Sequence, residues 1–118
     1  MKTQIIKLPI PSAKLSANAR CHWSEKARLN KQHRKLAHYH AALQLGLDAQ
    51  KISGYKLVFY WPDKRRRDKR NASERCKAYE DGISDFLKQD DSEWDFNGVQ
   101  FGEPDKKEPR VEFHLTTK

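Results

Sequence analysis

The sequence is poor in cysteine and in long apolar stretches, and each shortage excludes a class of protein. Cys21 and Cys76 are its two cysteines, and neither belongs to a C-x-x-C pair or to a zinc-ligand pattern. The sequence allows one disulfide, but we favour two reduced thiols. The apolar run in MKTQIIKLPIPSAK is too short for a signal peptide, and no stretch approaches the length of a membrane span. We therefore expect a soluble, cytoplasmic protein with no membrane partner.

Hydrophobic residues are also few, and acidic residues are outnumbered by basic ones. Hydrophobic residues make up 36% of the 118 residues and charged residues 34%, which is a polar composition for a globular protein. The 24 Lys and Arg outnumber the 16 Asp and Glu, so the formal net charge is +8. A clustered positive excess favours a polyanionic partner, most simply nucleic acid, although a basic protein without such a partner is the alternative. The length predicts one domain over residues 1–118.

The residue pattern predicts an α+β fold with a small mixed β-sheet and two main helices in the order β-α-β-α-β-β. The predicted strands cover residues 3–8, 55–60, 98–103 and 110–116, and the predicted helices cover residues 24–45 and 71–87. Ser24 is the expected N-cap of the first helix and Gly46 its stop. An apolar stripe is expected on that helix at Leu29, Leu36, His40, Leu43 and Leu47.

The second predicted helix has a capping signal and an apolar face. Asn71 is the expected N-cap, with Glu74 three residues later at the capping-box position. Its expected buried face repeats at four-three-four-three spacing and consists of Ala72, Cys76, Tyr79, Ile83 and Phe86.

Between the second strand and the second helix, six basic residues occupy the seven positions from Lys64 to Arg70, with Asp68 as the one acid. Such a run is expected to contact phosphates, which positions DNA without reading its bases. The expected DNA contacts are Lys64, Arg65, Arg66, Arg67 and Lys69, and Arg28, Lys31 and Arg34 of the first helix extend the surface. The alternative is a solvated basic loop that improves solubility.

Isolated carboxylates near this run suggest a metal ion that promotes the hydrolysis of a phosphodiester. A magnesium ion held by carboxylate oxygens can activate water and absorb the developing charge. The candidates are Asp68 and the pair Asp90-Asp91 after the second helix. They converge only if the chain turns back after that helix. Taken alone, the pair is more typical of a solvated turn than of a metal site. Asp68 alone is an equally weak signal, since an acid in a basic run also balances the charge of its neighbours.

Residues 63–91 resemble the RusA family of Holliday junction resolvases of bacteria and their phages. The basic run DKRRRD, followed by Asn71, Lys77, Asp81 and Asp90-Asp91, carries the resemblance. The segments LPIPS and PRVEFHLTT are similar to the family's opening strand and last strand. The resemblance implies a RusA-like α/β homodimer that binds four-way DNA junctions, and a Mg²⁺-dependent endonuclease that nicks two opposing strands symmetrically.

The resemblance also implies roles for single residues. Asp68 corresponds to the first metal-binding aspartate, and Asp91 to the carboxylate that completes the metal site, with Asp90 as its acidic neighbour. Lys77 corresponds to a helical lysine that stabilises the charged transition state. Asp81 is expected to orient Lys77 through an i,i+4 pair. The ordinary alternative for these last two is a surface ion pair.

Arg70 departs from the family's Asp-x-Asp-Asn pattern, because an arginine stands where the second aspartate is expected. A guanidinium cannot ligate magnesium and repels it. Three explanations stay open: Glu74 or Asp90 supplies the missing oxygen, the metal site has two carboxylates, or the protein binds junctions without cutting them. The function hypotheses are thus a magnesium-dependent junction endonuclease, a non-catalytic junction-binding protein of the same fold, or a basic adaptor for an acidic protein.

Overall fold

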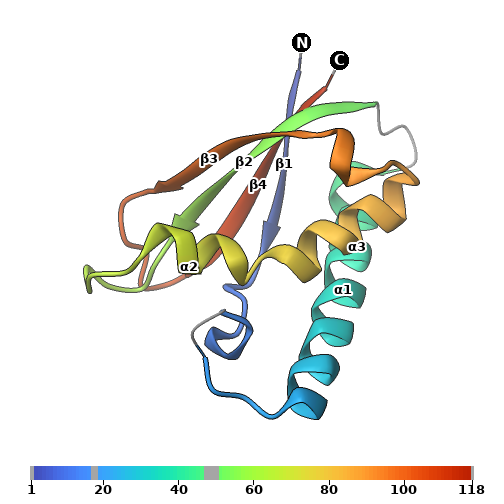
Figure 1. Ribbon diagram of the computed structural model, residues 1–118. Helices are drawn as coiled ribbons and strands as arrows, with labels where there is room; N and C mark the ends of the chain where they lie inside the picture. Colours follow the sequence, from blue (N-terminus) through green and yellow to red (C-terminus); the bar gives the residue numbers. More distant parts are fainter. Residues whose placement is uncertain (1, 17–18, 47–50, 118) are drawn as a thin grey trace.

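A mixed β-sheet forms the centre of the molecule, with helices packed on one of its faces (Figure 1). The structure is a computed structural model that describes residues 2–16, 19–46 and 51–117. Within these residues the sheet has four strands in the order β1-β4-β2-β3: β1 (Thr3–Leu8), β2 (Ile52–Tyr60), β3 (Asp95–Phe101) and β4 (Arg110–Thr117). β4 runs antiparallel to β1 and β2, whereas β3 runs parallel to β2. The predicted α+β class with a mixed sheet is confirmed.

The helical part differs in order from the prediction. The described helices are α1 (Trp23–Leu45), α2 (Lys69–Glu74) and α3 (Lys77–Leu87), with single 3₁₀ turns η1 (Ala13–Leu15) and η2 (Asp91–Glu93). The order is therefore β-α-β-α-α-β-β, because the second predicted helix is broken into two. At the break the N–H of Cys76 donates to the carbonyl of Ser73, a tighter i→i−3 bond that ends α2.

The N-cap of this helical segment lies three residues before the predicted Asn71. Asp68 has extended backbone, and its carboxylate accepts hydrogen bonds from the N–H groups of Arg70 at 2.8 Å and Asn71 at 3.2 Å. A carboxylate at this position satisfies two of the unpaired N–H groups of the first turn. The prediction for Asn71 was wrong, because an equally good cap occurs one turn earlier.

The first predicted helix is confirmed in extent, but its cap and its buried side differ. His22 rather than Ser24 is the N-cap, and its Nδ1 accepts from the Ser24 N–H. Gly46 ends the helix with φ of 71°, as predicted. Ala37 and Ala41 are fully buried and Leu36 of the predicted stripe packs against the core, whereas Leu43 is 63% exposed. Leu47 lies outside the described residues. Ala37 faces Gly82 of α3, and these small residues allow the two helices to approach closely.

The core lies between the sheet and the helices. Val111, Phe113 and Leu115 alternate along β4 and are fully buried, as predicted. On the helical side the predicted face is also confirmed: Ala72, Cys76, Tyr79 and Ile83 are buried, and Phe86 packs against them. The Tyr79 hydroxyl donates to the carbonyl of Pro9, which ties α3 to the chain after β1.

The two cysteines are both free. Cys76 is 2% exposed within the core, and burial raises the pKa of its thiol. Cys21 is partly exposed. In the portion of the chain that the structure covers, no helix has the length and apolar character needed to cross a membrane.

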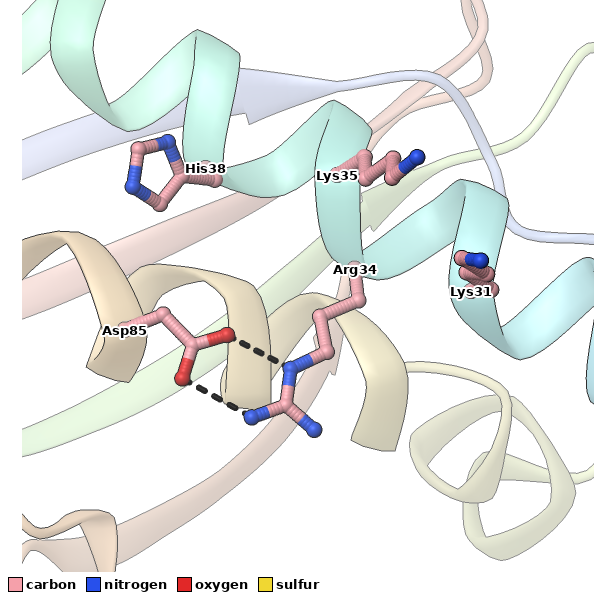
Figure 2. Close-up of a pocket in the computed structure, with 5 residues that line it drawn as sticks. All are labelled: Lys31, Arg34, Lys35, His38 and Asp85. Carbon is pink, nitrogen blue, oxygen red and sulfur yellow. Dashed lines mark hydrogen bonds and ion pairs between the residues drawn. The ribbon is translucent and has the colours of Figure 1, made fainter.

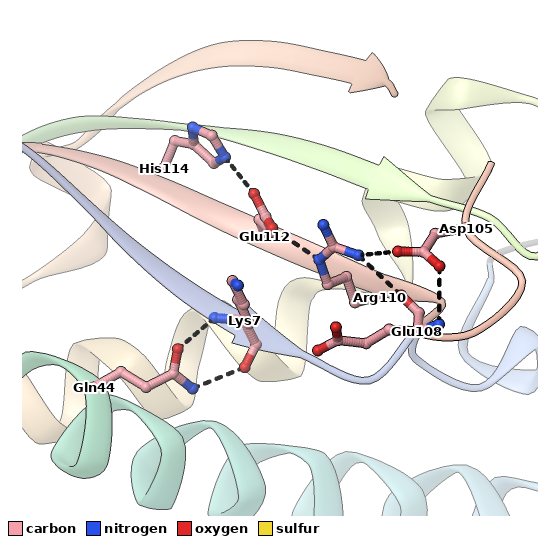
Figure 3. A network of polar contacts seen from close by, with 7 residues as sticks. All are labelled: Lys7, Gln44, Asp105, Glu108, Arg110, Glu112 and His114. Atoms are coloured by element: carbon pink, nitrogen blue, oxygen red, sulfur yellow. Dashed lines mark hydrogen bonds and ion pairs between the residues drawn. The ribbon is translucent and has the colours of Figure 1, made fainter. Parts of the chain in front are cut away.

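The opposite face of the sheet carries a network of polar side chains, shown in Figure 3. Glu112 is 5% exposed and accepts a hydrogen bond from Arg110 Nε at 2.8 Å. Its other oxygen lies 2.9 Å from His114 Nε2. Arg110 also pairs with Asp105 and stacks over the Tyr60 ring. This network covers the middle of the sheet where no helix packs.

Candidate nucleic-acid interface and acidic cluster

The basic loop between β2 and α2 is held in shape by its own charged side chains. The Asp63 carboxylate accepts from the Arg65 N–H at 3.0 Å and pairs with Arg67 at 2.8 Å. The backbone N–H of Arg65, and then Arg67, hold the pKa of Asp63 below its usual range. The Arg67 guanidinium also lies 4.4 Å from the centre of the Trp61 ring. Arg67 therefore serves to fix the loop, and its side chain is only 17% exposed.

The other cations of this loop face solvent. Lys64, Arg65, Arg66, Lys69 and Arg70 are all exposed. Among the described residues, none of these side chains has a carboxylate within ion-pair distance. Residues 66–70 line an open hollow of about 600 Å³. Arg70, which the sequence marked only as a departure from a metal-site pattern, is thus one of the exposed cations of this hollow.

Asp68 lies in the same hollow and already serves as the cap of α2. The neighbouring Lys69 places its ammonium 5.6 Å from the ring of Phe101, the last residue of β3. Asp68 is therefore close to the C-terminal end of β3, where Figure 1 also shows α2.

Asp91 lies at the other end of β3, in a second cluster around Lys77. α3 ends at Lys88, which has φ of 55°, and the chain then turns back. Lys77 Nζ lies 3.3 Å from Asp91 Oδ2 and 3.2 Å from Asp81 Oδ1. The turn that the sequence required is present, and the expected pair between Lys77 and Asp81 is confirmed. The turn after α3 brings Asp91 to Lys77, but not to Asp68.

Glu80 is a member of this cluster that the sequence analysis missed. It is partly buried, and its carboxylate lies near the hydroxyl of Tyr55. Burial raises the pKa of Glu80, and the nearby carboxylates of Asp91 and Asp81 add to this, although Lys77 opposes it. Its i,i+3 spacing from Lys77, which places both residues on one face of the helix, is the sequence signal by which it can be found.

The pKa of Lys77 is also raised, which for an ammonium favours the charged form. Burial favours its neutral form, but the carboxylates of Glu80, Asp81 and Asp91 outweigh this and raise the pKa of the ammonium. Lys77 therefore stays charged at neutral pH and neutralises part of the acidic cluster.

The remaining predicted metal ligands are also accounted for. Asp90 caps η2 through the N–H of Ser92 at 2.9 Å, which holds the pKa of its carboxyl below the usual range. Glu74 is the last residue of α2. Across the described ranges, no group of three or more His, Cys, Asp or Glu side chains is arranged to hold a metal ion. The magnesium site stays a prediction.

Comparison with known proteins adds one relative. No protein-family model matches the chain. A protein of Xylella fastidiosa strain Temecula1, described only as an uncharacterized protein, is 37% identical over 92 residues. The match covers 75% of this chain and 60% of that protein, so the chain spans less than two thirds of its relative's length. The relative carries no stated activity, and the site has to be interpreted from its own chemistry.

Proposed function

We propose that this protein binds branched DNA, with the four-way junction as its preferred form, in the manner of a RusA-type protein. One observation carries the proposal: the loop at residues 64–70 exposes five cations, three of which (Arg66, Lys69 and Arg70) line one hollow, while Asp63 and Asp68 are engaged by Arg67 and by the first turn of α2. Asp63 neutralises Arg67, and Asp68 caps a helix. The exposed cations are therefore available for phosphate groups.

Contacts of this kind position a nucleic acid without reading its sequence. A protein that selects DNA by shape needs such contacts at a fixed spacing, which the stacking of Arg67 on Trp61 provides by anchoring the loop to the sheet. The +8 net charge strengthens association with any polyanion. The proposal includes a homodimer that acts in the cytoplasm.

A second candidate function is magnesium-dependent cleavage of the junction, and the position of Lys77 beside Asp91 favours it. Carboxylate oxygens are the donors that magnesium prefers, and a bound ion would supply activated water. The present arrangement does not fit the ion, because the Lys77 ammonium lies between Asp81 and Asp91, whereas Asp68 caps α2 near the other end of β3. DNA binding without cleavage is therefore the first choice.

The test of binding uses a fluorescent four-way junction and a duplex of equal length, with anisotropy measured at several salt concentrations. Each phosphate contact contributes close to 0.9 to the salt slope, so Arg65→Gln/Arg66→Gln is expected to lower the slope by about 2. The control Lys7→Gln/Lys56→Gln removes the same charge from the open face of the sheet. Equal affinity for junction and duplex would contradict shape selection, and an unchanged slope in the loop variant would contradict the loop's role.

The same junction tests cleavage. The unaltered protein and Arg70→Asp are incubated with it in magnesium and in EDTA. Binding without nicks by the unaltered protein, with cleavage only in Arg70→Asp, supports a junction-binding protein whose metal site is incomplete. Paired magnesium-dependent nicks by the unaltered protein would instead establish the second candidate.

A further inference from the structure

A second basic surface lies away from the loop, in a groove between α1 and α3. The α1–α3 groove, of about 320 Å³, is lined by Lys31, Arg34, Lys35 and His38 of α1 and by Asp85 of α3 (Figure 2). The spacing of three, four and seven residues places the α1 side chains on one helical face. Three permanent positive charges face a single carboxylate.

The one carboxylate in the groove fixes an arginine. Arg34 donates from Nε to Asp85 Oδ2 at 2.5 Å and from Nη2 to Asp85 Oδ1 at 2.8 Å. In Figure 2 the third nitrogen of the guanidinium points away from Asp85. A bidentate pair of this kind orients the guanidinium and leaves donors for a second acceptor.

Lys31 and Lys35 remain without an acidic partner. Both side chains are exposed, and in the described part of the chain no carboxylate pairs with either. His38 packs edge-on against the ring of Phe86. The groove therefore presents positive charge that the protein does not neutralise.

The base of the groove depends on a close contact between backbones. A Cβ at Gly82 would lie 2.2 Å from the carbonyl oxygen of Arg34 and 2.9 Å from the Cβ of Ala37. Only glycine allows α3 to approach α1 so closely at this point. The close approach sets the distance between Asp85 and Arg34.

The groove continues towards the acidic cluster. A neighbouring hollow of about 380 Å³ is lined by Asn30, Lys31, Arg34, Lys77, Ala78 and Asp81. Lys31 and Arg34 line both hollows, so the groove extends to Lys77, whose ammonium pairs with Asp81 and Asp91. From Lys31 to His38 the helix rises about 10 Å, a length over which one strand of a duplex presents about three phosphates along the duplex axis.

We propose that the α1–α3 groove binds the phosphate backbone of a DNA strand, as a second contact site beside the basic loop. This assignment rests on the proposed DNA binding. The occupant is a strand of DNA because Lys31, Lys35 and the outer donors of Arg34 follow one face of α1 and carry positive charge that no acid in the groove neutralises except at Asp85.

The test measures salt-dependent binding of the four-way junction by Lys31→Gln/Lys35→Gln. Both side chains are exposed, and thermal unfolding checks that the fold is kept. The salt slope is expected to fall by about 2, with affinity at least about tenfold weaker near 100 mM salt. The control Lys7→Gln/Lys56→Gln removes equal charge from the opposite face of the sheet and is expected to retain the slope.

The outcomes distinguish a failure of the groove assignment from a failure of the proposed function. If Arg65→Gln/Arg66→Gln lowers the slope but the groove variant does not, DNA binding stands and the groove assignment fails. Equal losses in the groove variant and the control would also overturn the groove, because net charge alone would explain them. Absence of DNA binding by the unaltered protein would overturn the proposed function, and the groove assignment with it.

Discussion

Glu112 illustrates at the residue scale how a buried charge is stabilised on a sheet face that no helix covers. Burial alone would raise the pKa of its carboxyl, but hydrogen bonds from Arg110 and His114 outweigh this and lower it. A lowered pKa in the folded state means that the carboxylate favours folding above its ordinary pKa of about 4.3. That contribution is lost as the pH falls through the folded pKa.

We therefore expect Glu112→Gln to lower the free energy of unfolding at pH 7 by about 1–3 kcal/mol, because Arg110 loses the more buried of its two charged partners. The difference between the two proteins should shrink as the pH falls from about 5 to 3. Thermal or urea unfolding across this range measures it. The control Glu103→Gln changes an exposed carboxylate for which the described structure shows no ion pair. A difference for Glu112→Gln that stays constant over this range would contradict the pKa argument.

Single-residue roles were the least predictable part of the site. Sequence grouped Arg67 with the DNA-contacting cations, yet it is held by Asp63 and Trp61. Lys77 and Asp81 were paired correctly, since i,i+4 spacing on a helix decides that contact. The approach of Asp91 to Lys77 depends on a turn at Lys88, and local sequence does not fix where such a turn directs the chain.

At the scale of elements, the strands were predictable because their alternation reflects a buried face. β1 matches its predicted bounds, and the alternation of β4 gave its core side chains. The buried side of α1 was not fully predictable, because the helix packs through Ala37 against Gly82, and Ala41 is also buried, while Leu43 faces solvent. Leucine spacing cannot reveal a contact made by small residues.

Gly82 makes this contact testable. Helix propensity alone predicts that Gly82→Ala stabilises the protein by about 1 kcal/mol. The added Cβ would meet the Arg34 carbonyl at 2.2 Å, however, and α1 must move away. We expect net destabilisation of about 1–3 kcal/mol and a fall in Tm of about 4 °C or more. Gln32→Ala, on the exposed side of α1, controls for propensity. A rise in Tm on Gly82→Ala would show that the helices are not in such close contact.

At the scale of the whole molecule, the charges are sorted into separate regions. The basic loop lies near the C-terminal end of β3, and the Lys77 cluster and the α1–α3 groove lie towards the other side (Figure 1). One chain therefore offers positive surfaces in two places. A four-way junction has two-fold symmetry, and an isologous dimer would present each of these surfaces twice.

The proposed homodimer predicts a stoichiometry of two chains per four-way junction. Analytical ultracentrifugation of a labelled junction titrated with protein measures it directly, and the protein alone should sediment as a dimer at micromolar concentration. Because both basic surfaces are duplicated in a dimer, Arg65→Gln/Arg66→Gln should weaken junction binding without changing this stoichiometry. A 1:1 complex, or a monomer that binds junction and duplex equally, would contradict the two-fold arrangement. In that case the loop would be a general phosphate-binding surface, with no geometric preference for branched DNA.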